Sequence, residues 1–158
     1  MAFAGNVYPG DEKLFSNLYD ENCEILKNHF RGQKDWQSLN AEFIDQDGAL
    51  AFFSNEAYLF FLPAFLIADL NLNLDYNDPA VSLCWSFTDQ SENIKLAKTW
   101  GGNTISEQSK ERFKHFTHEQ VSVIVSYLQW RLSLEDDLCI RQALKNYWLP
   151  CLDQTFSK

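Results

Sequence analysis

The sequence predicts a mainly all-α fold, a single-domain helical bundle over residues 1–158 with a buried, proline-kinked central helix. Three observations support this prediction. Several segments place apolar residues at the spacing of one helical face, between capping residues. One central run is apolar on every side and holds a proline near its middle. The chain has 158 residues, 46% of them hydrophobic, and surface scaling predicts that about 69% of its surface is buried on folding.

The central run, SNEAYLFFLPAFLIADL, begins at Ser54. Ser54 is a favourable N-cap, and Glu56 stands in the first turn, where negative charge is stabilised. A helix that is apolar all round is buried all round, so we expect it at the centre of the bundle. Pro63 cannot bond the carbonyl of Leu59, and we expect a Trp N–H or an Arg of a neighbouring element to do so. A strand over residues 58–62 is the alternative, disfavoured because no polar face alternates there.

Further helices are expected on both sides of this run. Apolar spacing predicts a helix over residues 14–30, which Gly32 ends. Asp78 and Pro79 form an N-cap and first-position pair for a helix over residues 80–87.

The C-terminal part begins with the longest loop-like segment, residues 88–106, and loops carry function more often than cores do. A charged helix is expected over residues 106–116. The sequence THEQ, which starts at Thr117, is a capping box for an amphipathic helix. Ser133 is then expected to cap the final helix, and Pro150 to close it.

The net charge is −9 and the pI about 4.7. Such a chain is repelled by phosphate backbones and anionic membranes, so we expect neither nucleic acid nor a membrane as partner. A basic protein would instead be attracted and steered toward it. The alternative explanation of the charge is solubility alone.

The cysteine pattern and the apolar runs predict a cytoplasmic protein. None of the four cysteines lies in a C-x-x-C pair, which favours free thiols in a reducing compartment. The N-terminus lacks the pattern of a signal peptide. The uncharged run over residues 57–68 has 12 residues, whereas a membrane span needs about 20.

No motif predicts a cofactor. His115 and His118 are the only close histidine pair and a weak metal candidate, since Thr117 starts a new helix and the two rings need not share a face. Asp45 and Asp47 resemble a fragment of a calcium loop, but Ser54 stands where that loop needs a Glu. We therefore expect a turn there.

Two groups of residues are candidates for binding. His29, Arg31 and Trp36 could meet Glu56 at the start of the kinked helix, where a buried carboxylate beside an Arg would mark a site. The other explanation is a capping acid and a surface base. The second group is Glu135, Asp136 and Asp137, an acidic contact patch or the acidic first turn of the last helix.

The phrase SNEAYLFFLPAFL resembles the signature S-x-E-A-[FY]-x-[FY]-[FY]-L-P-A-[FY]-L of a bacterial domain family of unknown function. Other parts of the chain resemble further stretches of the same family, in the same order. These are YPGDEKL, CEILKNHFRGQKDWQSL, RFKHFTHEQVSVIVSYL and ALKNYW. The chain departs from the pattern at Leu59, where a basic residue often stands, and at Phe60 and Phe61, where tyrosines are frequent. The resemblance implies a bacterial, intracellular single domain and supplies no activity.

The sequence favours a small acidic intracellular binding protein over an enzyme. One hypothesis is an immunity-type or antitoxin-like protein that neutralises a basic toxin by occlusion. The alternatives are a small-molecule or enzymatic site near Glu56, and a self-associating interaction module with an exposed aromatic patch. Candidates for that patch are Trp100, Trp130 and Trp148. The oligomeric state does not follow from the sequence.

Overall fold

The computed structural model describes residues 2–15, 21–46, 48–97 and 102–154, and in these residues the chain is all-α, as predicted. Its β-pairing there consists of the isolated bridges Phe15–Phe53 and Lys95–Thr104. The contacts divide the chain into two compact units, residues 3–79 and 80–158, which are described in turn. No helix in the described ranges is long and apolar enough to cross a membrane.

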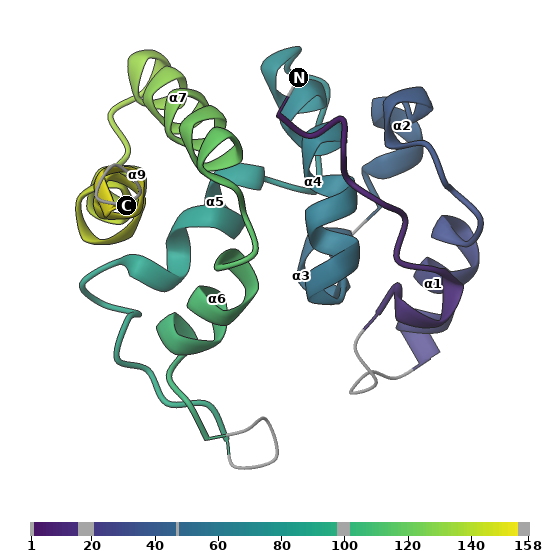
Figure 1. The fold of residues 1–158 in the computed structure, drawn as a ribbon, viewed down its shortest axis with the longest axis horizontal. Helices are drawn as coiled ribbons and strands as arrows, with labels where there is room; N and C mark the ends of the chain where they lie inside the picture. Colours follow the sequence, from purple (N-terminus) through teal and green to yellow (C-terminus); the bar gives the residue numbers. More distant parts are fainter. Residues whose placement is uncertain (1, 16–20, 47, 98–101, 155–158) are drawn as a thin grey trace. The chain divides into compact units, whose positions relative to one another are not determined.

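The first unit is built around α4 (Asn55–Leu70), drawn in Figure 1 with the helices that precede it. Those are the 3-10 turns η1 (Asp11–Lys13) and η2 (Trp36–Ser38) and the helices α1 (Glu21–Phe30), α2 (Ala41–Ile44) and α3 (Ala49–Phe52). Phe30, Phe53 and Phe61 meet with ring centroids 4.9–5.2 Å apart and form the centre of the core. Aromatic pairs at this spacing stabilise a core beyond the area that they bury.

Helix α4 begins as the sequence predicts. The hydroxyl of Ser54 accepts the N–H of Ala57 and donates to the carbonyl of Lys13, so one cap also holds the preceding segment. Most of α4 is buried, Pro63 included. The expectation of burial all round is wrong at its C-terminal end, where Ile67 is 51% and Leu70 46% exposed.

The carbonyl that Pro63 leaves without its helical donor is bound by Asn6. The side-chain amide Nδ2 of Asn6 donates to the carbonyl of Leu59 over 2.6 Å. The donor is therefore neither a Trp nor an Arg, because the N-terminal segment lies along α4 at this point (Figure 1). Tyr8 of the same segment packs edge-on against Phe60, with ring centroids 5.5 Å apart.

The segment before α1 differs from the expected helix over residues 14–30. Helix α1 begins at Glu21, and residues 16–20 lie outside the described ranges. Leu14 follows η1 with helical dihedral angles, and its carbonyl accepts the N–H of Ser54, while Phe15 forms a β-bridge with Phe53. Pairing with the α4 cap overrides the helical spacing here.

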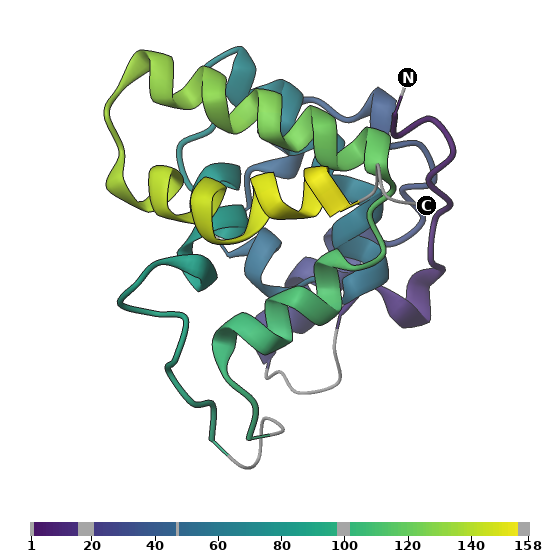
Figure 2. The same ribbon diagram turned by 60° about the vertical axis from the view of Figure 1, so that its left-hand side comes forward.

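The second unit contains α5 (Pro79–Cys84), the 3-10 turn η3 (Trp85–Phe87), α6 (Ile105–Phe113), α7 (His118–Leu134), α8 (Leu138–Ala143), the π-helical turn η5 (Leu144–Trp148) and α9 (Leu149–Gln154). Helix α7 lies alongside the continuous run from α8 to α9, as Figure 2 shows. The buried Trp148 donates its Nε1–H to the carbonyl of Leu83 over 3.0 Å, which joins this run to α5.

Capping residues in the second unit follow the predictions only in part. The capping box at Thr117 and Gln120 is present. Ser133 does not cap the last helix, because α7 continues through it and its hydroxyl donates to the carbonyl of Trp130. Asp137 caps α8 instead, accepting the N–H groups of Cys139 and Ile140.

Pro150 does not close the last helix, which continues to Gln154. The N–H of Leu149 bonds the carbonyl of Leu144, five residues back, so the helix widens into a π-turn immediately before the proline. A proline is tolerated where a new helical register begins, since the first-turn N–H groups have no helical acceptor.

Within the predicted loop over residues 88–106, the chain on either side of the Lys95–Thr104 bridge is joined by backbone hydrogen bonds. The N–H of Leu96 bonds the carbonyl of Asn103, and the N–H of Ile105 bonds the carbonyl of Ile94, both over 2.9 Å. Among the described cysteines, Cys84, Cys139 and Cys151 are thiols that form no disulfide, and Cys84 is buried.

Replacing Asn6 with alanine tests the hydrogen bond to Leu59. The Asn6→Ala variant leaves a partly buried carbonyl without this donor, so the free energy of unfolding in urea should fall by about 1–3 kcal/mol. Asn93→Ala is the control, because Asn93 is exposed and its amide bonds the neighbouring Glu92. We expect the control to change stability by less than about 0.5 kcal/mol. Equal losses in the two variants would contradict the assignment.

Candidate functional site

Charge is distributed unevenly along the chain. Residues 35–94 hold ten Asp or Glu and no Lys, Arg or His. Residues 1–79 carry a net charge of −9, from 13 acidic and 4 basic residues, whereas residues 80–158 hold nine of each sign. The whole net charge of the chain therefore belongs to the first unit.

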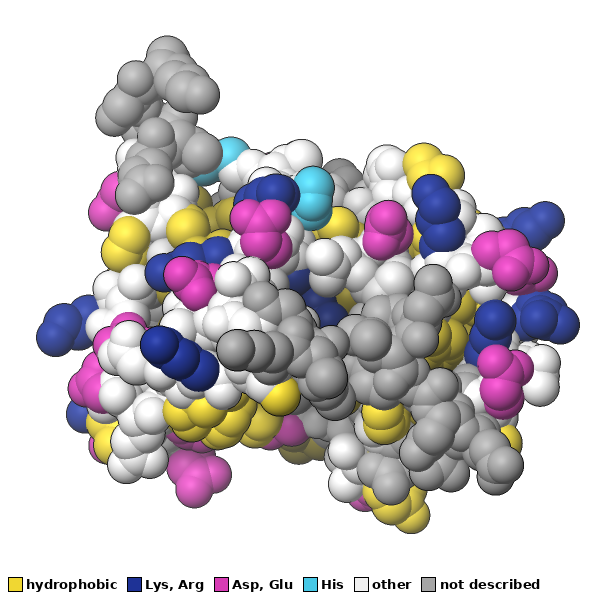
Figure 3. Space-filling model, turned by 90° about the horizontal axis from the view of Figure 1, so that it is seen from below, with side chains coloured by type: hydrophobic (Ala, Val, Ile, Leu, Met, Phe, Trp, Pro, Cys, Tyr) yellow, Lys and Arg dark blue, Asp and Glu magenta, His cyan; other side chains and the backbone are white. Residues whose placement is uncertain are grey.

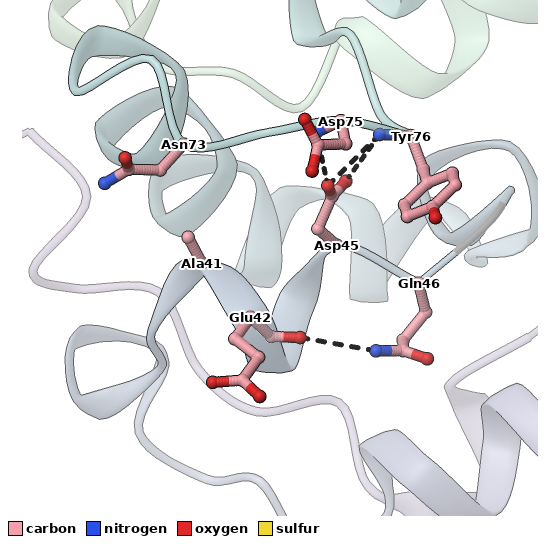
Figure 4. A pocket seen from close by; sticks show the side chains of 7 residues that line it. All are labelled: Ala41, Glu42, Asp45, Gln46, Asn73, Asp75 and Tyr76. Atoms are coloured by element: carbon pink, nitrogen blue, oxygen red, sulfur yellow. Dashed lines mark hydrogen bonds between the residues drawn. The ribbon is translucent and has the colours of Figure 1, made fainter.

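A cleft of about 540 Å³ lies in the acidic part of the first unit. It is formed between α2 and the segment that follows α4 (Figure 4). Three carboxylates, two amides and one aromatic ring line it; these residues are Ala41, Glu42, Asp45, Gln46, Asn73, Asp75 and Tyr76. Tyr76, which supplies the aromatic ring, is 70% exposed. The cleft thus combines negative charge with an accessible aromatic surface.

Asp45 fixes the shape of this cleft. Its carboxylate points from the end of α2 to the chain after α4 and accepts the backbone N–H groups of Asp75 and Tyr76 (Figure 4). It also accepts the backbone N–H of Asn77. The side-chain amide of Asn77 adds a fourth bond of 3.0 Å. Because these donors surround Asp45, the carboxylate holds the cleft wall in place rather than remaining open to a ligand.

Asn77 is the buried partner in this arrangement. Its Nδ2 donates to Asp45 and to the carbonyl of Gln46, and its Oδ1 accepts the N–H of Leu50. A buried amide with its donors and its acceptor bonded fixes the chain in one register. Asn77 therefore joins α2, α3 and the segment after α4.

The pKa of Asp45 is lowered in the folded protein. Burial by itself would raise this pKa, but the hydrogen bonds from the Asn77 amide and from the three backbone N–H groups favour the charged form and outweigh it. Asp45 is consequently ionised at neutral pH and contributes to the negative charge of the cleft.

The first group of predicted site residues lies elsewhere in the first unit. The His29 ring stacks on Phe43 with centroids 4.1 Å apart, and its Nε2 lies 2.7 Å from the Phe43 carbonyl. Trp36 is buried in η2, whereas Arg31 and Glu56 are exposed. Within the part of the chain that the structure describes, no hydrogen bond or ion pair joins any two of His29, Arg31, Trp36 and Glu56.

The acidic triplet is divided among separate local roles. Glu135 is the C-cap residue of α7, and Asp137 is the N-cap of α8. Asp136 forms an exposed ion pair with Arg141. Exposed pairs of this kind contribute little to stability.

The two histidines of the metal hypothesis lie on either side of a helix boundary. His115 is in the turn after α6, and His118 is the first residue of α7. Among the described residues, no group of three or more His, Cys, Asp or Glu side chains is arranged to hold a metal ion. Asp47, the partner of Asp45 in the calcium-loop fragment, lies outside those residues.

The cleft was not among the sites that we predicted from motifs, although one signal for it is present in the sequence. That signal is the stretch of residues 35–94 without a base, which can be read directly. The contact between Asp45 and Asn77 cannot be read in this way, because the two residues are separated by 32 positions.

The role of Asp45 predicts how stability depends on pH. Because its folded-state pKa is lowered, its stabilisation is present above the ordinary carboxyl pKa of about 4 and is lost as the pH falls through the folded-state pKa. At pH 7 we expect Asp45→Asn to be less stable by about 1 kcal/mol, and the difference should shrink in acid. Urea unfolding across pH 3–7 measures this, with Glu42→Gln as a control from the same cleft. A difference that stays constant with pH would contradict the prediction.

Comparison with known proteins gives a family and no activity. The model described as "Family of unknown function (DUF6714)" matches residues 14–152. No curated protein and no solved structure matches the chain. The match extends from the residue before the Phe15–Phe53 bridge into α9 and so includes most of both units. The chain therefore belongs to DUF6714, a family of unknown function.

Proposed function

We propose that this protein is a small acidic binding protein that recognises a basic protein partner. The observation that carries the proposal is the charge distribution: the first unit has a net charge of −9, and residues 35–79 hold eight acidic residues and no base. A surface of one sign attracts a partner of the opposite sign and raises the association rate. The mode of action that fits best is occlusion, as in an immunity protein or antitoxin that covers the basic active site of a toxin.

The acidic part of the first unit is the region best suited to this role. Among the side chains coloured in Figure 3, acidic and basic ones are interspersed. The cleft between α2 and residues 73–76 differs, because Glu42, Asp45 and Asp75 line it together. Its exposed Tyr76 adds an aromatic contact of the kind that dominates binding energy in interfaces.

Nucleic acid is a poorer partner for the same reason. Phosphate backbones are attracted by clustered Lys and Arg, and residues 35–94 contain none.

A small-molecule or enzymatic site near Glu56 is also less well supported. The exposed Glu56 is explained as an acid in the first turn of α4, where the helix dipole stabilises it.

The test is binding of the purified protein to the product of the neighbouring gene, measured by surface plasmon resonance at low and physiological salt. The double variant Glu42→Lys/Asp75→Lys should lower the association rate at least about tenfold and reduce its salt dependence. Glu111→Lys/Glu135→Lys makes the same change of net charge in the second unit and should lower the rate less than about threefold. Equal effects of the two pairs, or a rate that does not depend on salt, would contradict the proposal.

A further inference from the structure

Leu72 has a backbone conformation that leucine rarely adopts. Its φ is +56°, and among the described residues other than glycine no other φ is positive. The N–H of Leu72 bonds the carbonyl of Asp69, and the N–H of Asn73 bonds the carbonyl of Ala68. These two bonds define a Schellman motif at the end of α4, with Leu72 at the position that is usually glycine.

The local structure does not explain why leucine occupies this position. A left-handed conformation is unfavourable for a side chain with Cβ, whereas glycine adopts it freely and asparagine tolerates it. Asn71 and Asn73 stand on either side, yet the left-handed residue is the leucine. Leu72 is 76% exposed, so packing does not compensate the backbone strain.

Leu72 is one of four exposed apolar residues within positions 67–76. Leu70 and Ile67, one turn apart on α4, are 46% and 51% exposed, and Tyr76 is 70% exposed. Asn73 and Tyr76 of the same segment line the acidic cleft with Glu42 and Asp75. The exposed apolar residues therefore belong to the same chain segment that lines the acidic cleft, in a unit that has no base after Lys34.

We propose that this surface, formed by Leu70, Leu72 and Tyr76 beside Glu42 and Asp75, docks a partner segment in which an apolar side chain stands next to Lys or Arg. The inference rests on the proposed function and names the site and the chemistry of the partner. The carboxylates attract the basic residues, and Leu72 and Tyr76 provide the apolar contact that fixes the register. Backbone strain kept at an exposed position is typical of functional sites.

Charge complementarity favours such a partner over a second copy of this chain. In a symmetric dimer through this surface, the same patch of both copies would form the interface. The carboxylates of both copies would then be brought into one interface in which neither patch supplies a base, which is unfavourable. A basic segment meets no such opposition.

The test uses three short synthetic peptides of equal length and the full chain, with binding measured by fluorescence anisotropy. One peptide alternates lysine with leucine, the second lysine with serine, and the third glutamate with leucine. We expect the lysine–leucine peptide to bind at least about tenfold more tightly than the lysine–serine peptide, and the glutamate–leucine peptide not to bind.

Two variants at Leu72 separate binding from folding. Leu72→Gly and Leu72→Asn remove the apolar side chain and relieve the backbone, so the Tm should rise by about 2–4 °C. Affinity for the lysine–leucine peptide should nevertheless fall about five- to tenfold. Ile25→Ala, at a position of α1 that is 72% exposed, is the control and should leave the affinity unchanged.

Different results would contradict the inference, the proposed function or both. A lower Tm in both Leu72 variants would show that Leu72 is a packing residue and would overturn the inference. Equal affinity for the lysine–leucine and lysine–serine peptides would show that the surface makes no apolar contact with its partner. This result would overturn the inference, but it would not contradict the proposed function. If neither lysine peptide binds at low salt, the result would contradict both this inference and the proposed function. A concentration-dependent dimer that Leu72→Gly abolishes, seen by light scattering, would assign the surface to a second copy instead.

Discussion

The hydrogen bond from Asn6 to the carbonyl of Leu59 is the contact on which the arrangement of the first unit depends. Pro63 is buried within α4 and leaves this carbonyl without its helical donor. A carbonyl in that position is costly unless another group binds it. Asn6 supplies the bond, and the same N-terminal segment places Tyr8 against Phe60 and Phe61. One backbone defect in α4 therefore determines where the first residues of the chain lie.

Helix α4 connects this buried contact with the proposed docking surface. Its N-terminal half carries Leu59 and the core aromatic residues, and its last turn leads into the strained Leu72 and the wall of the acidic cleft. Asp45 and Asn77 hold that wall by hydrogen bonds to backbone groups. The surface is thus attached to the buried core of the first unit, and a preformed surface loses less conformational entropy when it binds. Its negative charge and exposed apolar residues both follow from residues 35–79.

Local patterns predicted the parts of the fold that depend on neighbouring residues. The caps at Ser54 and Thr117, and the burial of Pro63 within a helix, follow from short sequence patterns and are present in the structure. Patterns failed where distant contacts or a register change decide the outcome. Leu14 and Phe15 pair with the cap of α4 rather than extending a helix, and the π-turn before Pro150 lets the last helix continue. The donor to Leu59 lies 53 residues away, and no local rule identifies an asparagine at that distance.

The most direct measurement of the central contact is a double-mutant cycle between Asn6 and Pro63. In Pro63→Ala the alanine N–H can bond the carbonyl of Leu59, so the amide of Asn6 is no longer its essential donor. Free energies of unfolding in urea for the wild type, Asn6→Ala, Pro63→Ala and the double variant give the coupling energy. We expect Asn6→Ala to cost about 1–2 kcal/mol less in the Pro63→Ala background than in the wild type. An equal cost in both backgrounds would show that Asn6 does not compensate for the proline.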